Sequence, residues 1–270
     1  MIKLPYWPLL LSGLCSATTA SAASWLDDVE STFYLGVGKG YQQALVPGLE
    51  KNFNSAVLIV LTGDVKFHNF FIETPIHRNG AAIYGAAVGY QFYQQDNHSW
   101  DVLANNYNVW LPDNRTSDAT PELTGLRIRN ADSVVGLRYQ YQAERHQLSV
   151  ESGMDQAAHH GVISRVSYSY FLPWRNLDLY FNAALTYESA KTVNYYYGIH
   201  SDETGPARPY YQAGAGVKTH LGVSAIYPLA ERWLLDANLG VNLFSHQYLD
   251  SPVVTAQHEE LAVLMVRYVF

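Results

Sequence analysis

Residues 177–188 read Leu-Asp-Leu-Tyr-Phe-Asn-Ala-Ala-Leu-Thr-Tyr-Glu, and apolar and polar side chains alternate along this stretch. Every odd position is apolar or aromatic, whereas the even positions include Asp178, Asn182 and Thr186. Side chains of a β-strand point alternately to its two faces. The stretch therefore predicts a strand with one apolar face and one polar face.

The same two-residue period recurs at 233–243 and 135–141, and several such segments run to about ten residues or more. A tilted strand needs about that length to cross the hydrocarbon layer, whereas strands of soluble sheets usually stop near five or six residues. Only 15% of the residues are charged, against about a quarter in a typical soluble domain. We therefore favour a membrane β-barrel over a soluble β domain.

Composition excludes other classes of protein. A hydrophobic content of 48% excludes a disordered chain, and a net charge of −7 argues against nucleic acid as a partner. Beyond the N-terminus no run of 18 or more apolar residues occurs, which excludes membrane-spanning helices.

The spacing of the alternating segments predicts an all-β, transmembrane, antiparallel up-and-down β-barrel of twelve strands, with ten as the alternative. Short turns alternate with longer connections, as periplasmic turns and outer loops do in outer-membrane barrels, and an even strand number places both termini in the periplasm. The predicted strands are 31–40, 55–63, 67–74, 82–93, 96–105, 132–142, 145–153, 160–171, 176–188, 210–227, 231–244 and 259–270.

The end of the chain supports export to the outer membrane. Val266, Tyr268 and Phe270 share one face of the last predicted strand, and the chain stops at the phenylalanine. A terminal aromatic residue with another two positions earlier resembles the signal that the barrel-assembly machinery recognises. We expect that machinery, outer-membrane lipid and lipopolysaccharide to be partners of the chain.

The beginning of the chain resembles an export signal. Lys3 provides a positive n-region, 9–14 lie in a short apolar stretch, and Ala20-Ser21-Ala22 fits a cleavage site. We predict a signal peptide at 1–22 and a barrel domain at 23–270. The sole cysteine, Cys15, would leave with the signal, so the mature chain would have no disulfide.

Six charged residues are predicted to face the lumen, because their neighbours occupy the lipid face and a charge at mid-membrane costs about 2 to 4 kcal/mol. Both signs are present, so these groups could plug the barrel as ion pairs or line a channel. The six are Arg138, Arg165, Asp178, Glu188, Asp236 and Arg267.

Metal binding and hydrolysis each require a particular residue pattern. The ten histidines lack ligand spacing, and adjacent His159 and His160 would point to opposite faces of an extended chain, so we predict no metal site and no cofactor. An outer-membrane hydrolase would need a serine beside a histidine. His160 with Ser164 or Ser167 is the nearest candidate, but no third group is marked, so we predict no catalytic residue.

Several blocks in the later part of the chain resemble the MipA/OmpV family of MltA-interacting outer-membrane proteins. Their order and spacing match over about the last 80 residues. The blocks are Asn194-Tyr195-Tyr196-Tyr197-Gly198-Ile199, Tyr211 with Ala213-Gly214-Ala215-Gly216, Tyr227-Pro228-Leu229 with Trp233, Asp250-Ser251-Pro252-Val253-Val254, and Tyr268-Val269-Phe270.

The resemblance implies a non-enzymatic outer-membrane scaffold that brings a lytic transglycosylase together with a penicillin-binding protein during peptidoglycan growth. A small-solute channel is the alternative, and a hydrolase is the third possibility. For the motif itself we expect Gly198 to take a positive φ at a loop tip and Ser251-Pro252 to fix a turn, so that the outer loops fold over the barrel mouth rather than remain plain surface loops.

A scaffold also needs a periplasmic docking surface. The best candidate is the segment formed by Trp25, Leu26, Asp27 and Asp28, in which an aromatic anchor stands beside acids. The same segment could instead plug the barrel or fray.

Overall fold

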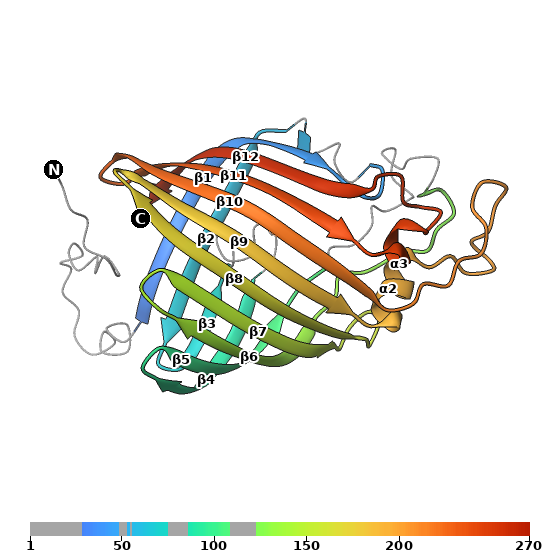
Figure 1. The fold of residues 1–270 in the computed structure, drawn as a ribbon, viewed down its shortest axis with the longest axis horizontal. Helices are drawn as coiled ribbons and strands as arrows, with labels where there is room; N and C mark the ends of the chain where they lie inside the picture. Colours follow the sequence, from blue (N-terminus) through green and yellow to red (C-terminus); the bar gives the residue numbers. More distant parts are fainter. Residues whose placement is uncertain (1–28, 49–52, 55, 75–85, 109–122) are drawn as a thin grey trace, which may run out of the picture.

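The computed structural model describes residues 29–48, 53–54, 56–74, 86–108 and 123–270. Its strands form one closed antiparallel barrel, in which each strand pairs with its sequence neighbours and the first pairs with the last (Figure 1). The predicted barrel and the choice of twelve strands over ten are thus confirmed.

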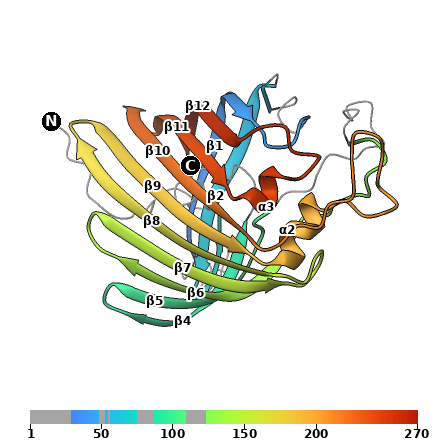
Figure 2. The same ribbon diagram turned by 45° about the vertical axis from the view of Figure 1, so that its right-hand side comes forward.

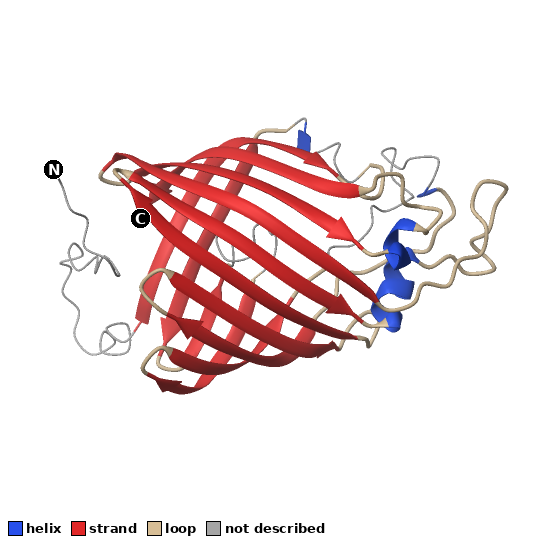
Figure 3. Cartoon of the chain, in the orientation of Figure 1, coloured by secondary structure: helices blue, strands red, loops and turns tan. Residues whose placement is uncertain are grey.

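The strands vary in length from four to fifteen residues. In chain order they are β1 (Val29–Gln43), β2 (Leu58–Phe67), β3 (Phe70–Glu73), β4 (Ala87–Gln95), β5 (His98–Asn105), β6 (Val134–Gln142), β7 (His146–Asp155), β8 (Val162–Trp174), β9 (Leu177–Glu188), β10 (Gly216–Ala230), β11 (Trp233–Phe244) and β12 (His258–Val269). Two helices, α2 (Ala190–Tyr197) and α3 (His246–Leu249), lie at one end (Figure 3). Within the described ranges, neither helix is long and apolar enough to cross a membrane.

Most strand boundaries differ from the predictions by one to six residues, and two of the differences have a clear cause. The strand predicted at 55–63 runs from Leu58 to Phe67, because this segment is apolar on both faces and alternation does not fix its register. The strand predicted from residue 210 begins only at Gly216. Residues 210–215 instead pass over the end of the barrel, where Tyr211 exchanges backbone hydrogen bonds with Ile199.

The faces of the strands are sorted by polarity. Outward-pointing Leu185 and Leu239 are 51% and 63% exposed, whereas inward-pointing Glu188 and Asp236 are 1% and 0% exposed. Apolar side chains thus cover the outside and polar side chains fill the inside, the reverse of a soluble protein. Such an apolar outer face suits contact with lipid hydrocarbon. The closed sheet leaves no strand edge unpaired in the hydrocarbon.

Short turns gather at the end of the barrel where β1 begins and β12 stops, and the longer connections gather at the other end (Figures 1 and 2). Three short turns contain a residue with positive φ followed by asparagine, at His68, Asp96 and Arg175. That the short-turn end faces the periplasm stays a prediction, and the signal peptide at 1–22 lies outside the described residues.

Closure depends on close contact between β1 and β12. Ten residue pairs join these strands in register, from Tyr34 opposite Val269 to Gln43 opposite Glu260. At Gly38 a Cβ atom would lie 2.2 Å from the carbonyl oxygen of Leu264. Only glycine fits there without displacing the backbone of the neighbouring strand.

We predict that Gly38→Ala lowers the free energy of unfolding by about 1 to 3 kcal/mol, because the added methyl overpacks the closure seam. Gly205→Ala is the matched control, since no atom lies within 4 Å of the position of its added Cβ, and we expect it to change stability by less than about 0.5 kcal/mol. Urea unfolding in detergent, followed by tryptophan fluorescence, measures both. Equal stability of the two variants would contradict the role of the seam.

Candidate functional site

Ion pairs fill part of the barrel interior. Arg138 on β6 donates from Nε to the carboxylate of Asp101 on β5 at 2.8 Å, and it also pairs with Glu73 on β3. Arg267 on β12 lies 2.8 Å from Asp236 on β11, with side-chain exposures of 2% and 0%. These charges are compensated and are covered by protein.

The remaining three predicted lumen residues lie in different surroundings. Glu188 at the end of β9 forms an ion pair with Lys218 at 2.7 Å and accepts a hydrogen bond from the Tyr248 hydroxyl at 3.0 Å. Arg165 on β8 stands in register with Glu151 on β7. Asp178 is partly buried near the short-turn end, at the start of β9.

A short strap, residues 106–108, leaves β5 and enters the interior. The Tyr107 hydroxyl donates to Glu151, and the backbone N–H groups of Tyr107 and Asn108 donate to the carboxylate of Asp132 at 2.7 and 3.1 Å. The Asn108 side chain donates to both Asp132 and Glu188. The strap therefore links β5 to the middle of β7, to Asp132 before β6 and to the end of β9.

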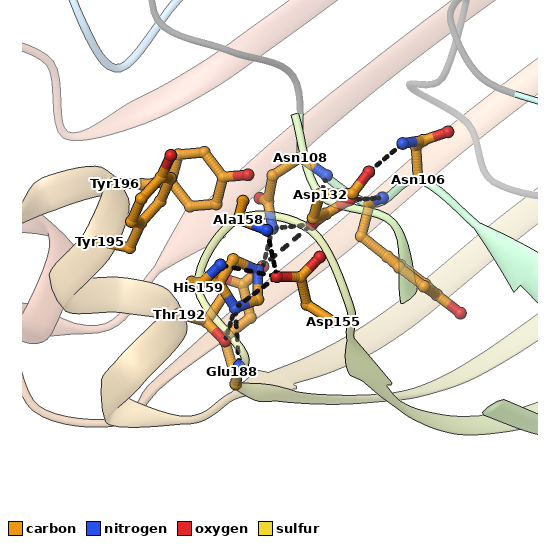
Figure 4. Close-up of polar contacts among 12 residues, drawn as sticks. Asn106, Asn108, Asp132, Asp155, Ala158, His159, Glu188, Thr192, Tyr195 and Tyr196 are labelled. Atoms are coloured by element: carbon orange, nitrogen blue, oxygen red, sulfur yellow. Dashed lines mark hydrogen bonds and ion pairs between the residues drawn. The ribbon is translucent and has the colours of Figure 1, made fainter. Parts of the chain in front are cut away.

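Asp155, the last residue of β7, organises the connection to β8 (Figure 4). One carboxylate oxygen accepts the backbone N–H groups of Ala158, His159 and His160 at 2.6 to 3.0 Å, and the other accepts those of Ser133 at 2.7 Å and Ala157 at 3.2 Å. One side chain thus satisfies five backbone donors and joins the segment after β7 to the one before β6.

His159 fills the space under α2. Its ring is fully buried, Nδ1 accepts the backbone N–H of Gly161 at 2.9 Å, and the ring lies edge-on to Tyr196 at 5.7 Å. Thr192 on α2 lies 3.2 Å from the same nitrogen (Figure 4). This histidine has a packing role, and the described residues hold no cluster of His, Cys, Asp and Glu suited to a metal ion.

Three connections, 123–133, 189–215 and 245–257, pack together over the long-loop end, and we call them the cap. Tyr195 and Tyr196 on α2 hold Asn130, because one hydroxyl accepts its N–H and the other donates to its carbonyl, both at 2.9 Å. Two apolar clusters complete the packing with residues of the β1–β2 connection. They are Val46, Leu123, Leu126, Ile199 and Val253, and Leu45, Val193, Ala213 and Tyr248.

A buried ion pair ties two of these connections together. Arg129 lies 2.9 Å from Glu203, with side-chain exposures of 4% and 1%. Burial alone would raise the pKa of Glu203, but hydrogen bonds from Arg129 and from the backbone N–H groups of Arg127 and His200 outweigh it and lower the pKa to about 2. The carboxylate is thus held ionised inside the cap.

The family motif adopts a different local structure from the expected one. Tyr195, Tyr196 and Tyr197 belong to α2 rather than to a loop tip, and Gly198 has φ of −72°, so the expectation of a positive φ is wrong. Glycine is required there because a Cβ would lie 2.3 Å from the Asn194 carbonyl oxygen.

The Asp250-Ser251-Pro252 block does form a turn, closed by a hydrogen bond from the Val254 N–H to the Ser251 carbonyl. The Ser251 hydroxyl also donates to the Tyr197 carbonyl at 2.6 Å, which joins the two motif blocks. The connections at the long-loop end therefore fold into a packed layer.

The C-terminal aromatic residues lie on the outer wall near the short-turn end. Tyr268 packs edge-on against Trp233 at 5.1 Å and Phe270 at 5.2 Å, and the Phe270 N–H donates to the Phe33 carbonyl. Val266 shares their outward face. Recognition of this strand by the assembly machinery stays a prediction, and Trp25, Leu26, Asp27 and Asp28 lie outside the described residues.

The hydrolase candidates do not come together. Ser164 shares a hydrogen bond with Ser152 at 2.8 Å, Ser167 is buried on the opposite face of β8, and His160 contacts the Asp155 carbonyl. Among the described hydrogen bonds, none joins His160 to either serine.

Sequence reasoning missed most partners of the predicted charges. The inward positions of Asp101 and Glu151 follow from alternation along β5 and β7 and could have been found in that way. The positions of Asp132, Glu203 and Arg129 could not be found, because these residues lie in connections without a period. Asp155 lies beyond the strand predicted at 145–153.

The fold, with its apolar wall and charged interior, is that of an outer-membrane β-barrel protein. The chain belongs to the MipA family, because the family model described as MltA-interacting protein MipA matches residues 35–270. The protein is thus one of the outer membrane, as its curated relatives are.

Two of these relatives are vibrio proteins. Outer membrane protein OmpV of Vibrio cholerae serotype O1 is 23% identical over 222 residues, which is 74% of this chain and 84% of OmpV. Outer membrane protein Omp26La of Vibrio anguillarum is 22% identical with the same coverage. Among solved structures, the NanC porin aligns with a TM-score of 0.42 and 9% identity, over 87% of this chain and 98% of that one.

The lowered pKa of Glu203 predicts an acid-sensitive cap. Ionised Glu203 stabilises the folded state above its ordinary pKa of 4.5, and this contribution is lost as the pH falls from 4.5 toward 2. We expect the near-ultraviolet circular dichroism of the cap tyrosines to decline in that window while the far-ultraviolet sheet signal persists.

Glu203→Gln should remove this step, whereas Asp202→Asn is the control, because Asp202 pairs with Arg127 at the surface. Superimposable titrations of the wild type and Glu203→Gln would contradict the assignment.

Proposed function

We propose that this protein is a non-conducting outer-membrane anchor whose periplasmic face holds a peptidoglycan-cleaving lytic transglycosylase and, beside it, a penicillin-binding protein. The observation that carries the proposal is the burial of charged side chains in the lumen. Arg138, Asp101, Glu188, Asp236 and Arg267 face the interior and are at most 4% exposed. In an open aqueous channel such groups would stand in water.

The polar cavity beside Arg138 supports the same proposal. Its volume is about 20 Å³, and its lining includes Glu73, Asn105, Glu151 and Ser167. A cavity of this size holds a water molecule but not a solute. Together with the cap over the long-loop end, it favours an anchor over a solute channel.

The choice of partner comes from the family description, MltA-interacting protein. A stable interface needs about 800 Å² on each partner. The short turns supply a ring of small surfaces, and we propose that Trp25, Leu26, Asp27 and Asp28 complete it as an aromatic anchor flanked by acids. A partner with a basic surface would complement this segment and the acidic chain.

Planar-bilayer recording tests the closed lumen. We expect the folded wild type to give no stable conductance steps at neutral pH. Arg267→Ala combined with Asp236→Ala should admit small ions because it empties buried volume beside Tyr34, over whose ring Arg267 lies at 5.0 Å. Arg127→Ala with Asp202→Ala removes an exposed pair and is the matched control. Stable conductance steps from the wild type would refute the non-conducting anchor and support the solute channel.

Binding to a purified MltA-type lytic transglycosylase tests the scaffold. We expect the full chain, immobilised in detergent, to retain the enzyme, and Trp25→Ala to weaken retention at least about tenfold if the tryptophan is a binding hot spot. Tyr210→Ala is the control, because Tyr210 is an exposed aromatic residue of the cap, at the opposite end of the barrel. Retention no greater than on an unrelated barrel of similar size would refute the scaffold.

A further inference from the structure

A groove runs across the outer wall formed by β8 to β12, the wall that faces the viewer in Figure 1. Its volume is about 690 Å³, within the range of about 300 to 1,000 Å³ usual for ligand sites. The outward side chains of Phe181, Ala183, Leu221, Val223, Leu239 and Ala262 line it.

The groove has a structural cause. One row of paired positions crosses the wall from Tyr41 on β1 through Ala262, Leu239, Val223 and Phe181 to Tyr170 on β8. Tyrosines stand at both ends of the row, and smaller side chains lie between them. Gly222 and Gly240 add bare backbone behind these side chains, so the wall is hollowed between two aromatic ridges.

The end of the groove nearest the short turns carries hydrogen-bonding and basic groups. Tyr168 and Tyr170 line the groove, and His146 contacts both, with its Nδ1 2.6 Å from the Tyr168 hydroxyl and its ring 5.2 Å from that of Tyr170. Arg145 precedes His146 and is exposed.

The next turn along the rim adds Arg175, which lies over the Trp174 ring at 5.8 Å. Two exposed carboxylates stand against these basic residues, Glu144 at the same turn and Glu260, which lines the β12 end of the groove. The chain has a net charge of −7, yet this part of the rim carries more basic than acidic side chains.

We infer that the groove is a binding site for an anionic phospholipid, with an acyl chain along the apolar row and the phosphate at Arg145, His146 and the Tyr168 hydroxyl. The location selects this occupant, because the groove opens to the hydrocarbon and its basic end lies at the level of the short turns. Basic side chains near a membrane surface attract anionic headgroups, and tyrosines favour the same depth. The inference does not depend on the proposed scaffold function.

Native mass spectrometry of the full chain, folded in detergent and exposed to equal amounts of phosphatidylglycerol and phosphatidylcholine, tests this site. We expect the wild type to retain phosphatidylglycerol preferentially. Ala183→Trp fills the groove and should lower that retention about tenfold, whereas Ala104→Trp, an equal change on the outward face of β5, should leave it unchanged.

The headgroup contacts need a separate variant. Arg145→Gln with His146→Gln should lower the preferential retention of phosphatidylglycerol about tenfold. Arg232→Gln is the control, because Arg232 lies at another turn and contacts Tyr268. Migration of unheated samples on a denaturing gel establishes that each variant has folded.

Three results would overturn the inference. They are equal retention of the two lipids by the wild type, unchanged retention in folded Ala183→Trp, and a lipid-free dimer, which would assign the groove to a second copy of the chain.

Discussion

A single constraint underlies this structure: hydrocarbon offers no hydrogen-bonding partner to the peptide backbone. A sheet can satisfy all its N–H and C=O groups in that medium only by closing on itself. The pairing of β1 with β12 provides this closure, and Phe270 extends it with a backbone hydrogen bond to Phe33. Because glycine at Gly38 lets the two strands approach, the seam joins without a displaced backbone.

Closure makes the interior a separate environment. Because the outward positions of the wall face hydrocarbon, the polar side chains of the strands point inward. Charges of both signs therefore meet within the barrel. There they form pairs such as Arg138 with Asp101 and Arg267 with Asp236. Removing one partner of such a pair would leave an uncompensated buried charge, at a cost of about 3 to 5 kcal/mol. The ion pairs therefore constrain the side chains of the interior as much as lipid constrains those of the exterior.

The cap is held together by a small apolar core, like that of a soluble domain. Tyr248 illustrates the connection between the two regions, because its ring packs among the cap residues while its hydroxyl donates to Glu188 inside the barrel. Asp155 acts similarly, since it accepts backbone donors of two connections, and Asp132 accepts two backbone donors of the strap. The long-loop end is thus organised by buried carboxylates and tyrosines, and the barrel wall by alternation.

The sequence by itself determined the barrel, its strand number and the inward positions of charges on the strands, because a two-residue period records on which side of a strand hydrocarbon lies. The sequence did not determine the structure of segments that lack this period. The register of β2, the helix at Tyr195 to Tyr197, the backbone of Gly198 and the Arg129–Glu203 pair emerged only from the tertiary structure. Apart from Gly198, whose close neighbour Asn194 is near in the chain, these features depend on contacts between residues distant in the chain. No local pattern specifies which connections meet once a barrel has brought their ends together.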